Sequence, residues 1–397
     1  MARSLAAALL VLALSACGGG SGGGGTPPPT GTNVAAVIVD AGPGGTSANL
    51  PFVTVTVCVP GTSTCQTIDH VLLDTGSTGM RIIYEGLGTS PISLPQAQSL
   101  AGNPLDECFQ FADGFTWGSV RTADVQVADG TALNVPIQLV GDPLVPGIPL
   151  DCPNGGPPEN TVVAFGANGV LGVSVFREDC GSACATIANP GGSGAYYDCP
   201  ASGCIGSTLA QAAQVQNPVY HFATNNNGVA VEMPTISSAG QLSARGSLIL
   251  GIGTQTNNQL GAATVLTVGT SGEFTTAYKG TTLTYSFIDS GSNAYFFNDS
   301  AMPACVTNVG FYCPARTTLS AVNTGKNGTV SNVSFDVADA DALTRNNPTF
   351  SALPNIAGTN TLPSSFDWGL PFLYGRRVYV AIEGQSTSAG LGPYVAY

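Results

Sequence analysis

The sequence predicts a mostly β protein with two similar lobes. Three observations support this prediction: the chain has 397 residues, its β-branched runs break at Gly, Pro and Asn, and one short motif occurs twice. The motif is an apolar run that ends in Asp, a hydroxyl residue, Gly and Ser, at 72–77 and again at 287–292. Because a chain of this length exceeds what one hydrophobic core usually serves, we expect one copy in each of two lobes, 34–255 and 256–397.

The N-terminus has the pattern of an export signal. Residues 1–17 combine a positive Arg3 with an apolar stretch that is too short to span a bilayer. The residues before Cys17 resemble a bacterial lipobox, which implies cleavage before Cys17 and acylation of it; the alternative is an ordinary signal peptide with a stray cysteine. The Gly- and Pro-rich segment 18–33 follows as a tether. We expect an exported cell-envelope lipoprotein, anchored to the outer membrane through Cys17, on its periplasmic or surface face.

The composition argues against nucleic acid as a partner. Only 9% of the residues are charged, yet the net charge is −13, and the only lysines are Lys279 and Lys326. Such a surface repels nucleic acid and anionic lipid headgroups. Low charge with abundant Gly, Thr, Ser, Asn and Val fits an exported β-rich protein.

The cysteines are expected to form disulfides. Cys17 aside, ten of the 11 cysteines remain, an even number in an exported chain. Spacing does not determine their pairing, although two pairs are close enough to staple short loops. Those two pairs are Cys58 with Cys65 and Cys305 with Cys313, and the others are Cys108, Cys152, Cys180, Cys184, Cys199 and Cys204. Zinc is the alternative, but the sequence has no Cys-x-x-Cys and only two histidines, so we expect no metal and no cofactor.

Both copies of the motif follow a strand-like run. Residues 52–59 alternate in the manner of a half-buried strand, and a turn at Pro60-Gly61 leads into a second run that ends at Asp74. The β-rich run 281–288 leads in the same way into Asp289. No shorter period is visible, so the repeat indicates a two-fold duplication.

A hairpin and one short helix complete the predicted elements. Asp129-Gly130 is a strong turn signal between the runs 120–127 and 135–140. Helical pattern is scarce, and its clearest case is 207–214.

Two carboxyl groups that meet in one cleft suit acid–base hydrolysis. Like charges cannot both persist at about 3 Å, so one acid ionises and acts as the base while its partner keeps a proton. We expect Asp74 and Asp289 to share these roles. Gly76 and Gly291 allow tight turns that bring backbone N–H groups onto each carboxylate. Ser77 and Ser292 can hydrogen-bond the outer carboxyl oxygens, and Thr75 and Ser290 can reach across between the lobes. These supporting residues are Thr75, Gly76, Ser77, Ser290, Gly291 and Ser292.

The sequence lacks the residues that other hydrolytic mechanisms require. There is no Gly-x-Ser-x-Gly elbow, no His-Glu-x-x-His and no phosphate-binding loop, and His70 and His221 give little material for a triad. One Asp motif alone would indicate a β-turn. The pair favours a shared catalytic site.

Several segments resemble the pepsin-like family of aspartic proteases. Residues 111–118 are similar to the flap hairpin of that family, which we place at 109–120. Further similar segments, in the same order as in the family, are 167–173, 246–251, 368–373 and 378–382. The chain also resembles a bacterial lipoprotein family catalogued only as a domain of unknown function.

The resemblance implies a two-lobed fold with a cleft between Asp74 and Asp289. It also implies a monomer that binds a polypeptide in extended form, with Phe111, Asp113 and Trp117 in the flap that covers the substrate. The leading interpretation is a membrane-anchored aspartic endopeptidase. One alternative is a non-catalytic envelope protein whose cleft binds peptide or glycan, and another is a structural lipoprotein whose Asp loops tie the lobes together.

Three positions depart from the family pattern. Phe111 stands where the flap tyrosine is expected, and Arg81 where its tryptophan partner often stands. Asp367-Trp368 replaces an aliphatic pair before Gly369. Trp117 either supplies the polar group that Phe111 lacks or packs within the hairpin.

Overall fold

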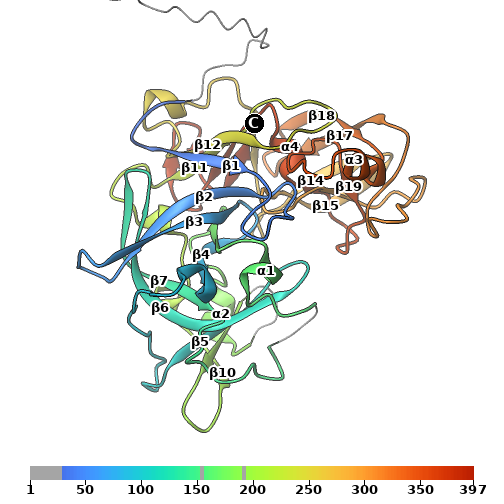
Figure 1. The fold of residues 1–397 in the computed structure, drawn as a ribbon. Helices are drawn as coiled ribbons and strands as arrows, with labels where there is room; N and C mark the ends of the chain where they lie inside the picture. Colours follow the sequence, from blue (N-terminus) through green and yellow to red (C-terminus); the bar gives the residue numbers. More distant parts are fainter. Residues whose placement is uncertain (1–28, 153–155, 190–193) are drawn as a thin grey trace, which may run out of the picture.

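The computed structural model describes residues 29–152, 156–189 and 194–397, and it confirms the mostly β, two-lobed fold (Figure 1). In Figure 1 the strands of the larger N-terminal lobe run down the left and centre, and the C-terminal lobe lies to the right. The predicted signal peptide, Cys17 and most of the tether lie outside the described residues.

The first sheet runs through both lobes. An added pairing between β6 and β2 folds its N-terminal part back on itself. In spatial order the strands of this sheet are β10 (Ile205–Ser207), β9 (Gly194–Asp198), β5 (Leu105–Gln110), β6 (Phe115–Val127), β7 (Gly130–Val140), β4 (Thr78–Ile83), β8 (Gly169–Val173), β3 (Cys65–Asp74), β2 (Pro51–Cys58), β1 (Val34–Val39), β12 (Ala244–Leu250), β11 (Gly228–Glu232), β21 (Arg377–Ala381), β24 (Tyr394–Ala396) and β13 (Val265–Thr267).

The second sheet belongs to the C-terminal lobe. In spatial order its strands are β18 (Val330–Val337), β17 (Thr317–Thr324), β14 (Phe274–Tyr278), β15 (Thr281–Ile288), β20 (Asp367–Trp368), β16 (Tyr295–Phe296) and β19 (Ala357–Gly358). A two-stranded ribbon joins β22 (Ser386–Thr387) to β23 (Gly390–Leu391).

Helices are short because Gly, Pro and Asn recur along the chain. The α-helices of the described residues are α1 (Val162–Phe165), α2 (Ser182–Thr186), α3 (Ala340–Asn346) and α4 (Leu370–Leu373), and the 3-10 helices are η1 (Tyr84–Leu87), η2 (Gln211–Ala213), η3 (Pro218–His221) and η4 (Thr256–Asn258). None of the described helices is long and apolar enough to cross a bilayer.

The strand predictions are confirmed, and the helix prediction is wrong. The motif-bearing runs form β3 and β15, and β6 and β7 pair around the turn before Gly130. The segment 207–214 contains only the single 3-10 turn η2, since Ser207 already belongs to β10. Its alanines favour a helix locally, but the β9–β10 pairing and Gln214, whose amide donates to the Leu209 carbonyl at 3.0 Å, hold it extended.

Five disulfides link the ten cysteines of the described residues. Two of them are the pairs that spacing favoured, and three others stabilise the N-terminal lobe. The pairs are Cys58–Cys65, Cys108–Cys152, Cys180–Cys184, Cys199–Cys204 and Cys305–Cys313. Disulfides persist in oxidising compartments, which indicates an exported, non-cytoplasmic protein.

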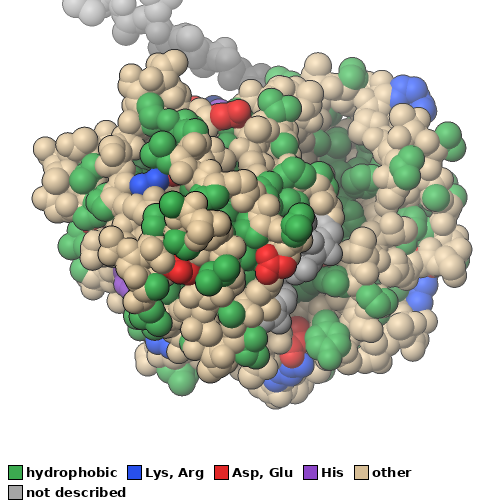
Figure 2. Space-filling model, turned by 90° about the horizontal axis from the view of Figure 1, so that it is seen from below, with side chains coloured by type: hydrophobic (Ala, Val, Ile, Leu, Met, Phe, Trp, Pro, Cys, Tyr) green, Lys and Arg blue, Asp and Glu red, His purple; other side chains and the backbone are tan. Residues whose placement is uncertain are grey.

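The surface carries few charges and is hollowed between the lobes. Viewed from below, most of the visible face is uncharged, and a recess separates the larger lobe from the smaller one (Figure 2).

Candidate active site

The site lies where the two Asp motifs meet. Asp74 ends β3 and Asp289 directly follows β15, so each carboxyl stands at the end of a strand in its own lobe. A Cβ on Gly76 would lie 2.5 Å from Cγ of Asp289, and a Cβ on Gly291 would lie 2.8 Å from Cγ of Asp74. Since such distances are too short for a side chain, only glycine lets the two loops approach this closely. Each acid therefore lies against the loop of the other.

A reciprocal set of hydrogen bonds locks the two loops together. The Thr75 hydroxyl donates to the Ile288 carbonyl at 3.1 Å and accepts from the Ser290 amide at 2.9 Å. The Ser290 hydroxyl donates to the Leu73 carbonyl at 2.6 Å and accepts from the Thr75 amide at 3.0 Å. Thr75 and Ser290 are buried. This four-bond set, which we call the interlobe lock, fixes the spacing of the acids.

A strand behind each motif loop supports it. β8 runs parallel to β3 and places Gly172 opposite Asp74. β20 runs parallel to β15, and the Asp289 amide donates to the Trp368 carbonyl at 3.1 Å. The segments 167–173 and 367–370 thus take equivalent places in the two lobes.

Backbone amides bind one oxygen of each acid. Oδ1 of Asp74 accepts from the amides of Gly76 at 2.7 Å and Ser77 at 3.2 Å, and Oδ1 of Asp289 accepts from Gly291 at 2.8 Å. N–H donors of this kind stabilise a carboxylate and orient it.

The two serines of the motifs behave differently. The Ser292 hydroxyl contacts Oδ2 of Asp289 at 2.9 Å, whereas the buried Ser77 hydroxyl has no hydrogen-bond partner among the described residues. The expectation that Ser77 binds the outer oxygen of its Asp through its hydroxyl is therefore wrong. Only its backbone amide reaches Asp74. The pair of acids is asymmetric.

Burial and neighbouring charge act on the pKa of Asp289. Burial, with the nearby Asp74 and then Asp367 carboxyls, raises the pKa of Asp289 well above its usual range. The Asp289 side chain remains partly exposed and Gly76 is exposed, so solvent reaches the floor of the site. Two adjacent carboxyl groups that share one proton can in general do acid–base work on a bound water.

The flap hairpin places Phe111 beside an aromatic cluster. The Phe111 amide donates to the Gly114 carbonyl at 2.8 Å and closes the turn between β5 and β6. The ring packs edge-on against Phe109 and Phe165, with centroids 4.9 and 5.4 Å away. Asp113, at the tip, is exposed.

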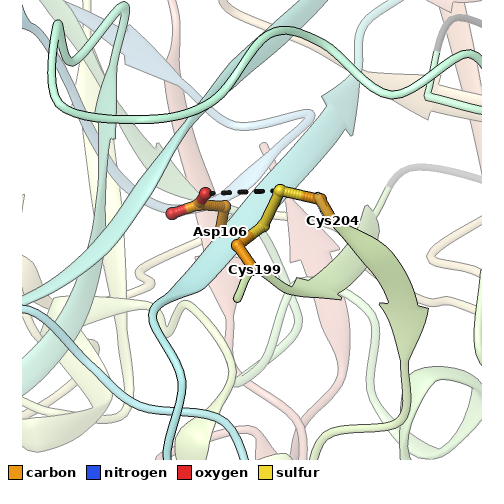
Figure 3. Close-up of side chains that lie close together, drawn as sticks. All are labelled: Asp106, Cys199 and Cys204. Carbon is orange, nitrogen blue, oxygen red and sulfur yellow. Dashed lines mark hydrogen bonds between the residues drawn. A yellow bond between two sulfur atoms is a disulfide. The ribbon is translucent and has the colours of Figure 1, made fainter. Parts of the chain in front are cut away.

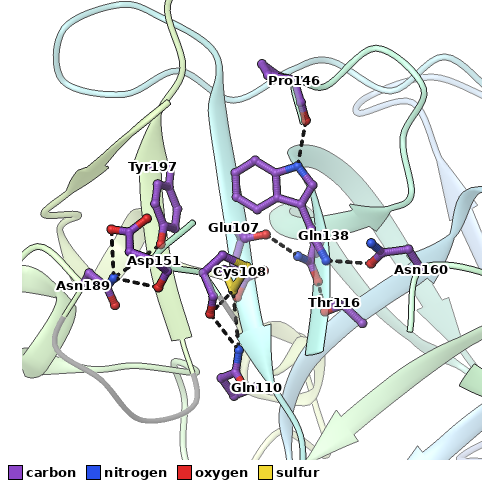
Figure 4. The surroundings of a disulfide bond; sticks show 12 residues. Glu107, Cys108, Gln110, Thr116, Gln138, Pro146, Asp151, Asn160, Asn189 and Tyr197 are labelled. Atoms are coloured by element: carbon purple, nitrogen blue, oxygen red, sulfur yellow. Dashed lines mark hydrogen bonds between the residues drawn. A yellow bond between two sulfur atoms is a disulfide. The ribbon is translucent and has the colours of Figure 1, made fainter. Parts of the chain in front are cut away.

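Neighbouring segments pin this hairpin. β9 pairs along the free edge of β5, and the Cys108–Cys152 disulfide links β5 to a loop, with Gln110 donating to the Cys152 carbonyl at 3.0 Å (Figure 4). Near the tip, the Phe115 amide donates to the Pro157 carbonyl at 3.1 Å. The flap is an integral part of the sheet.

Trp117 lies inside the hairpin, where it packs against the disulfide. Its indole N–H donates to the Pro146 carbonyl at 3.0 Å, and its ring meets Tyr197 edge-on (Figure 4). Trp117 is buried, so it neither covers substrate nor replaces the missing tyrosine hydroxyl. The expectation that Trp117 belongs to the substrate cover is therefore wrong, and Trp117 packs inside the hairpin.

Arg81 packs against the base of the flap and pairs with two buried acids. Its guanidinium is fully buried, lies 3.5 Å from the centroid of the Phe109 ring, and bonds Glu107 at 2.9 Å and Asp179 at 2.7 Å. The sequence identified Arg81 as unusual but gave no sign of these acids, which lie far along the chain.

Glu159 also lies beside the flap and was not predicted. It is buried next to Gly114, since a Cβ on that glycine would lie 2.6 Å from Cδ of Glu159. Burial, with a smaller effect of Asp113, raises the pKa of Glu159 to about 8. No local pattern marks it, because the contact depends on pairing between distant segments.

The described residues bring together two groups that have the composition of a metal site. One is Asp106 with Cys199 and Cys204 (Figure 3), and the other is Asp341 with Cys305 and Cys313. In both groups the cysteines form a disulfide and so offer no thiolate. Neither group fits a metal ion.

Comparison with known proteins supports the fold. The crystal structure of aspartic proteinase from Irpex lacteus is similar to this chain with a TM-score of 0.52 and 14% identity, covering 91% of this chain and 96% of that one. A search of curated proteins found no significant match. The model of a family described as "Protein of unknown function (DUF3443)" matches residues 29–397.

Proposed function

The chain belongs to the DUF3443 family of proteins of unknown function, and from its own site we propose that it is an aspartic-type endopeptidase. One observation carries the proposal: Asp74 and Asp289 face each other across loops that are interlocked between two lobes. The similarity to an aspartic proteinase supports the fold alone, so the activity rests on this geometry.

In the proposed reaction one acid of the pair removes a proton from a bound water while the other keeps its proton. The water attacks the peptide carbonyl, and the retained proton passes to the leaving nitrogen. The raised pKa of Asp289 favours the retention of one proton in the pair. Phe111 closes over a polypeptide bound in extended form, and its lack of a hydroxyl leaves it an apolar cover.

A second candidate is a non-catalytic protein whose cleft binds peptide or glycan. The pinned flap favours it, because β9 and the Cys108–Cys152 disulfide limit how far the hairpin can lift. Two adjacent carboxyl groups at the cleft floor favour the enzyme, since a binding cleft has no chemical use for them.

The test is cleavage of a denatured protein mixture by the full chain, purified with its disulfides formed, between about pH 3 and 7.5. Cleavage that is blocked by a statine-type inhibitor and lost in Asp74→Asn and in Asp289→Asn supports the enzyme. The matched control is Asp69→Asn, also on β3 but with a side chain 70% exposed, which should cleave normally. No cleavage at any pH by folded protein would refute the enzyme and leave the binding protein.

We further propose that lipid on Cys17 anchors the protein to the membrane, on the evidence of the lipobox-like residues before it. Metabolic labelling with a fatty acid tests this, because the unmodified protein should carry the label and Cys17→Ser, which has no thiol to acylate, should not. Absence of label on the unmodified protein would refute the lipid anchor.

A further inference from the structure

A third carboxyl group lies directly behind the candidate active site. Asp367 begins β20, which packs between β15 and β16. Along this strand the side chains alternate, so Trp368 enters the aromatic core, stacked on Phe366 at 4.0 Å, while Asp367 points to the Asp289 loop. Asp367 is 6% exposed, and its Oδ1 has no hydrogen-bond partner among the described residues.

The hydroxyl of Ser292 lies between two carboxyls. Its Oγ is 2.6 Å from Oδ2 of Asp367 and 2.9 Å from Oδ2 of Asp289. A serine hydroxyl has one proton, so it can donate to only one of them. The other contact is favourable only if that carboxyl is itself protonated and donates to Oγ. At least one of the two acids therefore carries a proton.

The surroundings identify Asp367 as the acid that keeps its proton. The titratable groups that face it are Asp289, at the end of β15, and Asp74, at the end of β3. β16 places Phe296 opposite it, and no ion pair among the described residues includes Asp367. Burial first, and then repulsion by Asp74, raise the pKa of Asp367 well above its usual range, although Ser292 opposes this. Asp289 has a backbone amide donor as well, which Asp367 lacks.

We propose that Asp367 is a proton-bearing positioning residue that holds the Ser292 hydroxyl toward Asp289 and that ends activity at high pH when it ionises. The neutral acid donates to Ser292, and Ser292 donates to Asp289. When Asp367 loses its proton, the Ser292 hydroxyl turns toward the new carboxylate and Asp289 loses its donor. This inference rests on the proposed endopeptidase function.

The test compares the pH profile of kcat/KM in Asp367→Asn with that of the unmodified protein. The asparagine amide is always neutral and still donates to Ser292, so the alkaline limb should move up by about one pH unit. If Asp367 were ionised in the active enzyme, its removal would lower the pKa of the Asp pair and move the limb down. An unchanged or lowered limb overturns the proposal.

Two further variants test whether Asp367 acts through Ser292 and whether the effect is specific to Asp367. In a Ser292→Ala background, Asp367→Asn should no longer move the limb; a persisting shift would show that Asp367 does not act through Ser292. The matched control is Asp106→Asn, because Asp106 is also buried, with a pKa raised to about 7 by burial, but bonds Gln96. Asp106→Asn should leave the alkaline limb of the kcat/KM profile unchanged, and a shift of that limb in this variant would overturn the proposal.

Unfolding measurements separate this inference from the proposed function. When a buried acid holds its proton only in the folded state, the free energy of unfolding of the protein falls as pH rises from about 4 through the folded-state pKa of that acid. Asp367→Asn should therefore flatten the fall in stability as pH rises above about 4. If the stability of the variant falls as steeply as that of the unmodified protein, Asp367 does not hold a proton in the folded state and the proposal is overturned. A flattened fall without cleavage by any variant overturns the endopeptidase instead.

Discussion

The interlobe lock should account for a large part of the stability of the folded chain. The informative changes are Thr75→Val and Ser290→Ala, because each removes one hydroxyl with little loss of volume. Thr75→Val leaves the Ser290 amide without an acceptor and the Ile288 carbonyl without a donor. Ser290→Ala does the same to the Thr75 amide and the Leu73 carbonyl.

The expected size follows from counting the partners left unpaired. A buried polar group that loses its partner costs about 1–3 kcal/mol. Each variant leaves two such groups at a buried site, so each should reduce the free energy of unfolding by about 2–6 kcal/mol. The two side chains bond to different backbone groups and not to each other. Their effects should nevertheless not add fully, because both act on one interface.

Urea unfolding at constant pH, with the disulfides intact, measures these changes. The control is Thr67→Val on β3. The Thr67 hydroxyl forms a hydrogen bond of 2.8 Å with another threonine hydroxyl, but Thr67 is exposed. That variant should change the free energy of unfolding by less than about 0.5 kcal/mol. If Thr75→Val or Ser290→Ala is no more destabilising than Thr67→Val, the lock is not what holds the loops together.

Two further predictions concern the flap. Arg81→Met should destabilise the protein by about 3–5 kcal/mol, because Glu107 and Asp179 stay buried without their cation, and adding Glu107→Gln should recover part of the loss in urea unfolding. Because the pKa of Glu159 is raised to about 8, Glu159 contributes stability below about pH 4.5 that is lost as pH rises to 8, at about 1.4 kcal/mol per unit. Glu159→Gln should flatten that loss in thermal unfolding between pH 5 and 8, and an unchanged slope would contradict the assignment.

Much of the fold could be predicted because its signals are local. Alternation predicted β2, strand-like runs that lead into the two acids predicted β3 and β15, and the Asp129-Gly130 signal predicted the hairpin of β6 and β7. Close cysteine spacing favoured two of the disulfides. In each case the residues that determine the structure lie within a few positions of one another.

The remaining features depend on contacts between distant segments. Arg81 meets an acid 98 residues away, and Ser292 meets Asp367 at a separation of 75. The sequence identified Arg81 and Asp367 as departures from a family pattern, yet it could not assign their partners. Trp117 is similar, since its indole N–H is bound by a loop carbonyl 29 residues away.

The energetics of the site bear on why its acids are there at all. If the Asp loops served only to tie the lobes together, Thr75 and Ser290 would suffice, because the lock uses no carboxylate. The acids are costly: burial raises the pKa values of Asp289 and Asp367, and one buried oxygen of Asp367 has no hydrogen-bond partner in the part of the chain that the structure describes. Apolar residues at these positions would fold more stably. A conflict of this kind between stability and local chemistry is typical of functional sites, and it favours a catalytic site over a structural one.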